Sequence, residues 1–156
     1  MSSSRRWAGA WVGGVVIWGL ICGLSAARAD VIELGELDLS KMSAGWGAPV
    51  RDASIEKKPM SIAGEAFERG VGSHAGSEMH IALDGRAERF AAKVGVDDET
   101  QGRGTVRFKV YGDGHKLFDS GVMKGRQKAA MVDVPLGGVR RLILLATSAG
   151  DGVNYD

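Results

Sequence analysis

Short runs of alternating apolar and polar residues, separated by glycine-containing turns, constrain the fold of this chain most strongly. In Thr105–Tyr111, the residues Val106, Phe108 and Val110 fall on one face of an extended strand, and the residues between them fall on the other. This pattern is typical of a strand with one buried and one solvated face. No long stretch keeps a helical period with caps at both ends. The 24 glycines are about twice the average share, which also favours a turn-rich, all-β protein over a helix bundle.

Seven segments have the alternation or the β-rich composition of strands. They are Ile32–Leu39, Met79–Leu83, Arg89–Val96, Thr105–Tyr111, Lys116–Asp119, Met131–Val134 and Leu142–Thr147. Gly112-Asp113-Gly114 predicts a hairpin turn between two of them, because glycine accepts positive φ. The run Leu142–Leu145 is apolar on both faces, so we expect it inside a sheet. Short strands at regular spacing favour an antiparallel β-sandwich.

Residues 1–29 have the pattern of a secretory signal peptide. Arg5 and Arg6 precede an uncharged apolar run from Trp7 to Leu24, and Ala27-Arg28-Ala29 supplies small residues at a cleavage site. We predict cleavage before Asp30. The alternative is an uncleaved anchor, because the run, counted to Ala27, reaches the length of about 20 residues that spans a bilayer.

Removal of this segment changes the chemistry available to the chain. It takes away the only cysteine, Cys22, and three arginines, which leaves 17 basic and 19 acidic residues in 30–156. The mature chain then has no disulfide, thiol nucleophile or thiolate metal site. The near-neutral charge argues against nucleic acid as a partner. We expect a secreted protein, extracellular or periplasmic, without membrane contact after cleavage.

Two loop residues are candidates for ligand contact. His74 lies in the glycine-rich segment Gly70–Gly76, whose spacing is not the dinucleotide fingerprint, so we expect a tight loop there. His74 is either a buried structural residue or a contact to a sugar hydroxyl. Trp46, between Gly45 and Gly47, either stacks on the apolar face of a sugar or fills the end of the sandwich with its N–H bonded to backbone.

Asp97-Asp98-Glu99 is a run of carboxylates that follows the expected strand ending at Val96. Adjacent strand residues point to opposite faces, so the run is a poor acid–base pair for glycoside hydrolysis. It either caps a turn or supplies one calcium ligand. The segment 151–156 is also rich in oxygen ligands. No G-x-S-x-G element is present in the sequence, and we predict no catalytic residue.

A series of motifs follows one another from Leu37 onward. They are Leu37–Leu39, Gly45–Gly47, Gly70–Ala75, Phe90–Asp98, Val106–Gly114, Leu117–Val122 and Leu142–Leu145. In this order they resemble the NPCBM family, a carbohydrate-binding module found beside family 98 glycoside hydrolases and some α-galactosidases. The combination of G-x-G-x-H-A, G-V-D-D and G-D-G carries the resemblance.

The resemblance implies a galactose-binding-like jelly-roll β-sandwich over residues 30–156. It implies non-catalytic binding of galactose-containing glycans, with Trp46, His74 and Asp98 as candidate contacts. It also implies structural calcium, for which the candidate ligands are Asp97, Asp151 and Asp156.

The family continues with a further strand after the position of Asp156, so we expect the module to be incomplete at its C-terminus. This expectation leaves open that the chain is the N-terminal part of an α-galactosidase-like glycoside hydrolase, with a tethered catalytic domain. A second alternative is an extracellular β-sandwich that binds proteins.

Overall fold

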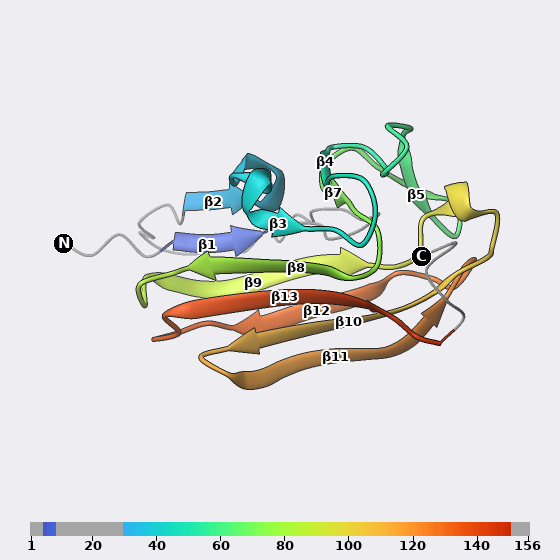
Figure 1. Cartoon of the computed structure of the whole chain (residues 1–156). Coiled ribbons are helices and arrows are strands. Elements are labelled where there is room, and N and C mark those ends of the chain that lie inside the picture. The colour runs from blue at the N-terminus through green and yellow to red at the C-terminus, as the bar shows by residue number, and fades with distance from the viewer. Residues whose placement is uncertain (1–4, 9–29, 151–156) are drawn as a thin grey trace, which may run out of the picture.

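The computed structural model describes residues 5–8 and 30–150, and these form a β-sandwich (Figure 1). One sheet is antiparallel with the order β11–β10–β13–β8–β3, and the second has the order β12–β9–β1–β2. Two short ladders, β4–β7 and β5–β6, complete the fold. In chain order the strands are β1 (Arg5–Ala8), β2 (Asp30–Glu33), β3 (Met42–Ser43), β4 (Val50–Arg51), β5 (Met60–Ile62), β6 (Glu65–Phe67), β7 (Val71–Gly72), β8 (Ser77–Ala82), β9 (Ala87–Val94), β10 (Thr105–Gly112), β11 (His115–Lys124), β12 (Ala130–Pro135) and β13 (Arg141–Ser148).

The core lies between the two sheets. The apolar face of β10 is fully buried, as the alternation predicts, and Phe108 faces Ala146 of β13 in the ladder. Phe90 of β9 and Val132 of β12 join the same apolar cluster from the second sheet. Each fully buried side chain of this size contributes about 1.5–3 kcal/mol, so the sandwich is held mainly by these facing rows.

Six of the seven expected strands are confirmed. The all-apolar run Leu142–Leu145 lies in β13, which is bonded to β10 on one side and β8 on the other, so its interior position is also confirmed. The turn at Gly112-Asp113-Gly114 joins β10 to β11, with Asp113 and Gly114 both at positive φ.

The expected strand Ile32–Leu39 is wrong beyond Glu33. Two 3-10 turns, η1 (Leu34–Glu36) and η2 (Leu39–Lys41), replace its second half. Local hydrogen bonds explain the change: Glu36 accepts from the backbone N–H of Glu33 at 3.3 Å, and Asp38 accepts from the N–H of Ser40 at 3.2 Å. Short polar side chains that bond to nearby backbone compete with strand pairing in this way.

The strand β1 lies within the segment expected to be a signal peptide. It pairs in parallel with both β2 and β9. The rest of that segment, and its cleavage site at Ala29, lie outside the described residues, so cleavage stays a prediction. Within the described ranges, no helix has the length and apolarity needed to cross a membrane.

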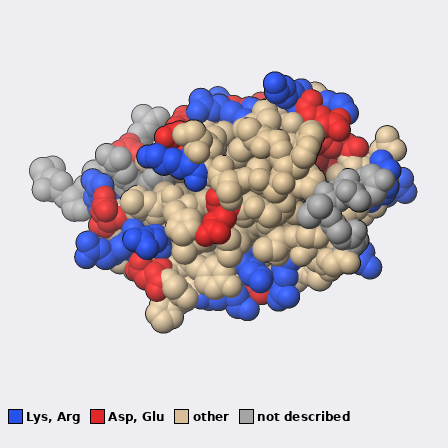
Figure 2. Space-filling view, viewed as in Figure 1, with Lys and Arg blue, Asp and Glu red and all other residues tan. Residues whose placement is uncertain are grey.

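Figure 2 shows one face of the molecule, in which most charged side chains gather around the rim and the centre is largely uncharged. Lysine and arginine are interspersed with acidic residues along this rim. Several charged side chains of the described residues pair across strands; Arg89 of β9, for example, bonds to Asp133 of β12.

Candidate functional site

The loops that follow β3 and β7 meet at one end of the sandwich (Figure 1). Their contact is made by backbone: a Cβ atom on Gly45 would lie 1.9 Å from the carbonyl oxygen of Ala75. Gly76 then donates to the carbonyl of Ala146 in β13 at 2.8 Å, which fixes the loop to the central sheet. Glycine at position 45 is therefore required by space, because no side chain fits between the two loops.

This contact brings Trp46 next to His74. The two ring centroids are 6.1 Å apart and the rings are inclined by 62°. Trp46 is 62% exposed, whereas His74 is only 8% exposed. The exposure of Trp46 rules out the alternative in which it fills the end of the sandwich. We call this pair the Trp46–His74 platform; an exposed indole backed by a second ring is the kind of surface on which a sugar can stack.

The backbone of the glycine-rich loop is fixed from beneath by two buried serines. Ser73 and Ser77 lie with their Oγ atoms 2.5 Å apart, and the Ser77 hydroxyl donates to the carbonyl of His74. The Nδ1 atom of His74 lies 3.2 Å from the carbonyl of Ala75, a geometry in which the ring N–H donates to that oxygen. The burial and this bond of His74 fit its structural interpretation, and a contact from His74 to sugar stays a prediction.

Asp98 has a different set of partners. Its carboxylate accepts from the Ser61 hydroxyl at 2.8 Å and from the backbone N–H groups of Ala63 and Gly64 at 2.9 and 2.8 Å. Burial alone would raise the pKa of Asp98, but these hydrogen bonds outweigh it and hold the pKa below its usual value. Asp98 thus closes the turn of the β5–β6 hairpin, and a contact from Asp98 to sugar stays a prediction.

Of the three residues predicted as calcium ligands, Asp97 is the one that lies within the described ranges. One of its oxygens accepts from the N–H of Glu99 at 2.9 Å and the other from the N–H of Ser61 at 3.1 Å. Burial is the main reason that the pKa of Asp97 is raised. No cluster of three metal-ligating side chains occurs among residues 5–8 and 30–150, and Asp151 and Asp156 lie outside those ranges. These contacts fit turn capping, and calcium remains a prediction.

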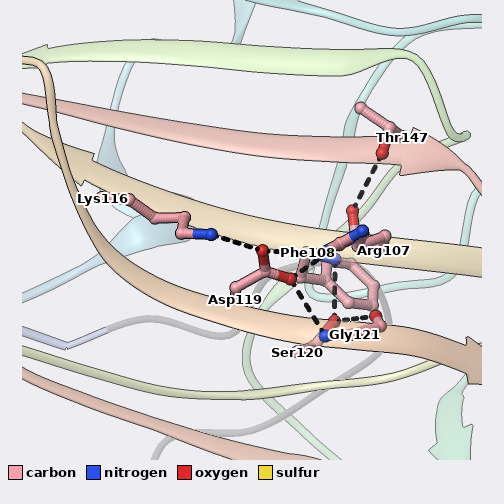
Figure 3. Close-up of polar contacts among 7 residues, drawn as sticks. All are labelled: Arg107, Phe108, Lys116, Asp119, Ser120, Gly121 and Thr147. Atoms are coloured by element: carbon pink, nitrogen blue, oxygen red, sulfur yellow. Dashed lines mark hydrogen bonds and ion pairs between the residues drawn. The ribbon is translucent and has the colours of Figure 1, made fainter.

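A second polar cluster joins β10 to β11 (Figure 3). Arg107 donates to both oxygens of Asp119 at 2.7 and 2.8 Å, and Lys116 bonds to the same carboxylate at 3.0 Å. The Asp119 carboxylate also accepts from the N–H of Gly121 at 3.0 Å. The hydrogen bonds from Arg107 are the main reason that the pKa of Asp119 lies well below its usual range.

This cluster marks a β-bulge. The pairing register of β10 and β11 shifts between Arg107 and Lys109, and Gly121 has a φ of 66°. Ser120 fills the gap in the ladder by accepting from the N–H of Phe108 at 2.9 Å and donating to the carbonyl of Gly121 at 2.7 Å. The cluster therefore stabilises an irregular strand pair. Beyond it, β11 runs on to Lys124, past the expected end at Asp119.

Residues 30–156 match the NPCBM/NEW2 domain family. The chain belongs to this family. The sequence resemblance and the expected non-catalytic β-sandwich module are thereby confirmed. The chain is also similar to the CBM51 module of the Clostridium perfringens GH95 protein, which was solved in complex with methyl-galactose. The identity is 34%, the TM-score is 0.73, and the match covers 79% of this chain and 90% of that one.

Two longer relatives carry hydrolase names. A Renibacterium salmoninarum protein with the name of an endo-alpha-N-acetylgalactosaminidase is 32% identical over 69% of this chain. Alpha-1,3-galactosidase B of Akkermansia muciniphila is 31% identical over 67% of this chain. The match with this chain covers only 8% and 14% of the lengths of these relatives. The similarity therefore concerns a small part of much larger proteins.

Proposed function

We propose that the NPCBM/NEW2 domain binds galactose-containing glycans at the Trp46–His74 platform without catalysing their cleavage. The observation that carries the proposal is the exposed Trp46 ring, held against His74 by a loop contact that only glycine permits. The similarity to a module solved with methyl-galactose supports galactose as the sugar class.

The geometry suggests how such binding works. The apolar C–H face of a galactose ring stacks on the exposed indole of Trp46, and its hydroxyls are left for polar neighbours such as Nε2 of His74. One ring and few polar anchors make a small contact. We therefore expect a dissociation constant of about 10 μM to 1 mM, which is the range of a shallow site.

Calorimetric titration with methyl-galactoside tests the proposal. Trp46→Ala is expected to raise Kd by about tenfold or more, equivalent to ~1.4 kcal/mol, while circular dichroism shows an intact fold. Met131→Ala is the matched control, because Met131 is also strongly exposed but lies on β12. Unchanged affinity in a folded Trp46→Ala protein contradicts the role of the platform. A folded wild-type protein that binds no sugar on a glycan array favours the protein-binding alternative.

We also propose that the domain is exported and serves a larger hydrolase. The charged start, apolar run and Ala-x-Ala site of residues 1–29 support export. The much greater length of the two named relatives supports a tethered catalytic domain. The intact mass and N-terminal sequence of the protein purified from its native source test both statements: a retained Met1 contradicts cleavage, and a mass equal to residues 30–156 contradicts the tether.

A further inference from the structure

We propose that Glu99 is a positioning residue for the Trp46–His74 platform and that it acts through Ser54. The inference rests on the proposed function for its ligand, but its geometry is independent of any ligand. Ser54 is 1% exposed, and its hydroxyl donates to Oε2 of Glu99 at 2.6 Å. The two residues are 45 positions apart in the sequence. We call this pair the Glu99–Ser54 clamp.

The clamp fixes a closed loop. The Ser54 hydroxyl also accepts from the N–H of Lys58 at 3.1 Å, and its backbone bonds to Lys58 and Lys57 at 2.9 Å. The loop from Ser54 to Lys58 is thus bonded to itself, and Glu99 in the 3-10 turn η3 (Asp98–Thr100) attaches it to the body of the domain. A hydrogen bond to a carboxylate is stronger than one between neutral groups, so Glu99 contributes strongly to the attachment of this loop.

The clamped segment packs against both loops that carry the platform residues. On one side, a Cβ atom on Gly72 would lie 2.3 Å from the carbonyl oxygen of Ala53 and 2.6 Å from the carbonyl carbon of Ser54. The segment therefore lies directly against the loop that carries His74. On the other side, the side chain of Ile55 reaches to 3.6 Å from the Cβ position of Gly47, the residue after Trp46.

The space around the clamp is too small for a sugar. A cavity of about 30 Å³ is lined by Ser54, Gly72, Ser73 and Glu99, among others, which is room for one or two water molecules. The clamp therefore acts on the platform through packing, and a direct contact between Glu99 and a sugar is the alternative that the substitutions below distinguish. The path from Glu99 runs through its hydrogen bond to Ser54, along the chain to Ile55, whose side chain lies beside Gly47, and from Gly47 to its neighbour Trp46.

Three substitutions test the clamp by titration with methyl-galactoside. Glu99→Ala is expected to raise Kd about tenfold, the size of effect that corresponds to losing one hydrogen bond to a charged group. Glu99→Gln keeps an oxygen that accepts from Ser54 and should restore most of the affinity. Ser54→Ala removes the bond to Glu99 and also the one that the hydroxyl accepts from the Lys58 N–H, so its Kd should rise at least as much as that of Glu99→Ala. The double variant should lose no more affinity than Ser54→Ala alone, because Ser54→Ala already removes the bond to Glu99.

Trp46 provides a readout that does not need a sugar. The indole fluorescence of Trp46, measured against a Trp46→Phe blank, should shift and become more open to acrylamide quenching in Glu99→Ala. Glu68→Ala, which removes an exposed carboxylate elsewhere, is the matched control. If wild type binds no galactoside but the fluorescence changes, the proposed function fails and the clamp stands.

Two results overturn the clamp. One is unchanged fluorescence and affinity in folded Ser54→Ala and Glu99→Ala proteins. The other is a loss of affinity in Glu99→Ala that Ser54→Ala does not reproduce, because this would mean that Glu99 contacts the sugar directly. If Glu99→Ala does not fold, Ser54→Ala alone decides the outcome with the same measurements.

Discussion

Replacement of Gly45 by alanine should weaken both the fold and the platform. The added Cβ atom would lie 1.9 Å from the Ala75 carbonyl oxygen, against an ordinary contact distance of at least 3.4 Å. The two loops must therefore separate by about 1.5 Å. The opposing atom is backbone, so no side-chain rotation relieves the overlap.

The energetic cost follows from this geometry. Overpacking of a well-packed site usually costs about 1–3 kcal/mol, and we expect Gly45→Ala at the upper end because two backbones are in contact. A domain whose free energy of unfolding is about 5–15 kcal/mol stays folded after this loss of stability, and its Tm falls on the order of 10 °C. Since Trp46 is the next residue, the affinity for methyl-galactoside should fall as well.

Urea unfolding, differential scanning calorimetry and sugar titration measure these effects. Gly137→Ala is the matched control, because its Cβ meets no atom within 4 Å and its φ lies outside the left-handed region. We expect this control to stay within about 0.5 kcal/mol of wild type. If Gly45→Ala is as stable as Gly137→Ala and binds sugar equally well, the loop contact does not hold the platform and our reasoning is refuted.

Two further predictions concern ionisation and metal. The lowered pKa of Asp119 means that its contribution to stability is present above its ordinary pKa and is lost as the pH falls through the folded value. Asp119→Asn should therefore lower the free energy of unfolding at pH 7 and reduce the loss of stability on acidification, as measured by urea titration at several pH values; parallel pH profiles would contradict this. If structural calcium is present, chelation with EDTA should lower Tm and added Ca²⁺ should restore it, whereas an unchanged Tm would remove calcium from the proposal.

The strands of the sandwich could be predicted because their signal is local. The alternation in Thr105–Tyr111 and the apolar run Leu142–Leu145 each lie within one strand, and burial in the structure follows them closely. The prediction over Ile32–Leu39 failed where side chains bonded to their own backbone, at Glu36 and Asp38. Alternation says nothing about such competing local bonds.

The site was predictable only as separate residues. Trp46 and His74 could each be named from their glycine-flanked positions, but their contact joins two loops that only the folded sheets bring together. The role of Glu99 could not be predicted, because its partner Ser54 has no distinctive neighbours in the sequence. A buried serine bonded to a distant carboxylate becomes visible only in three dimensions.

The acidic run Asp97-Asp98-Glu99 bears on the affinity for sugar that we expect of the Trp46–His74 platform. Asp98 closes the β5–β6 turn, Asp97 bonds to Ser61, and Glu99 holds Ser54, so three adjacent carboxylates fix neighbouring loops, and Glu99 fixes the one that packs against the loops of the platform. We therefore expect binding to require little ordering of the loops, and we expect the small contact area to keep the affinity low. A rigid but weak site gains most from a second site on the same chain, because linkage raises the effective concentration without any new contact. If the domain belongs to a larger hydrolase, fusion to a second copy should tighten binding to a multivalent galactoside surface far more than any substitution at Trp46 or His74, and surface plasmon resonance at varied glycan density measures this difference.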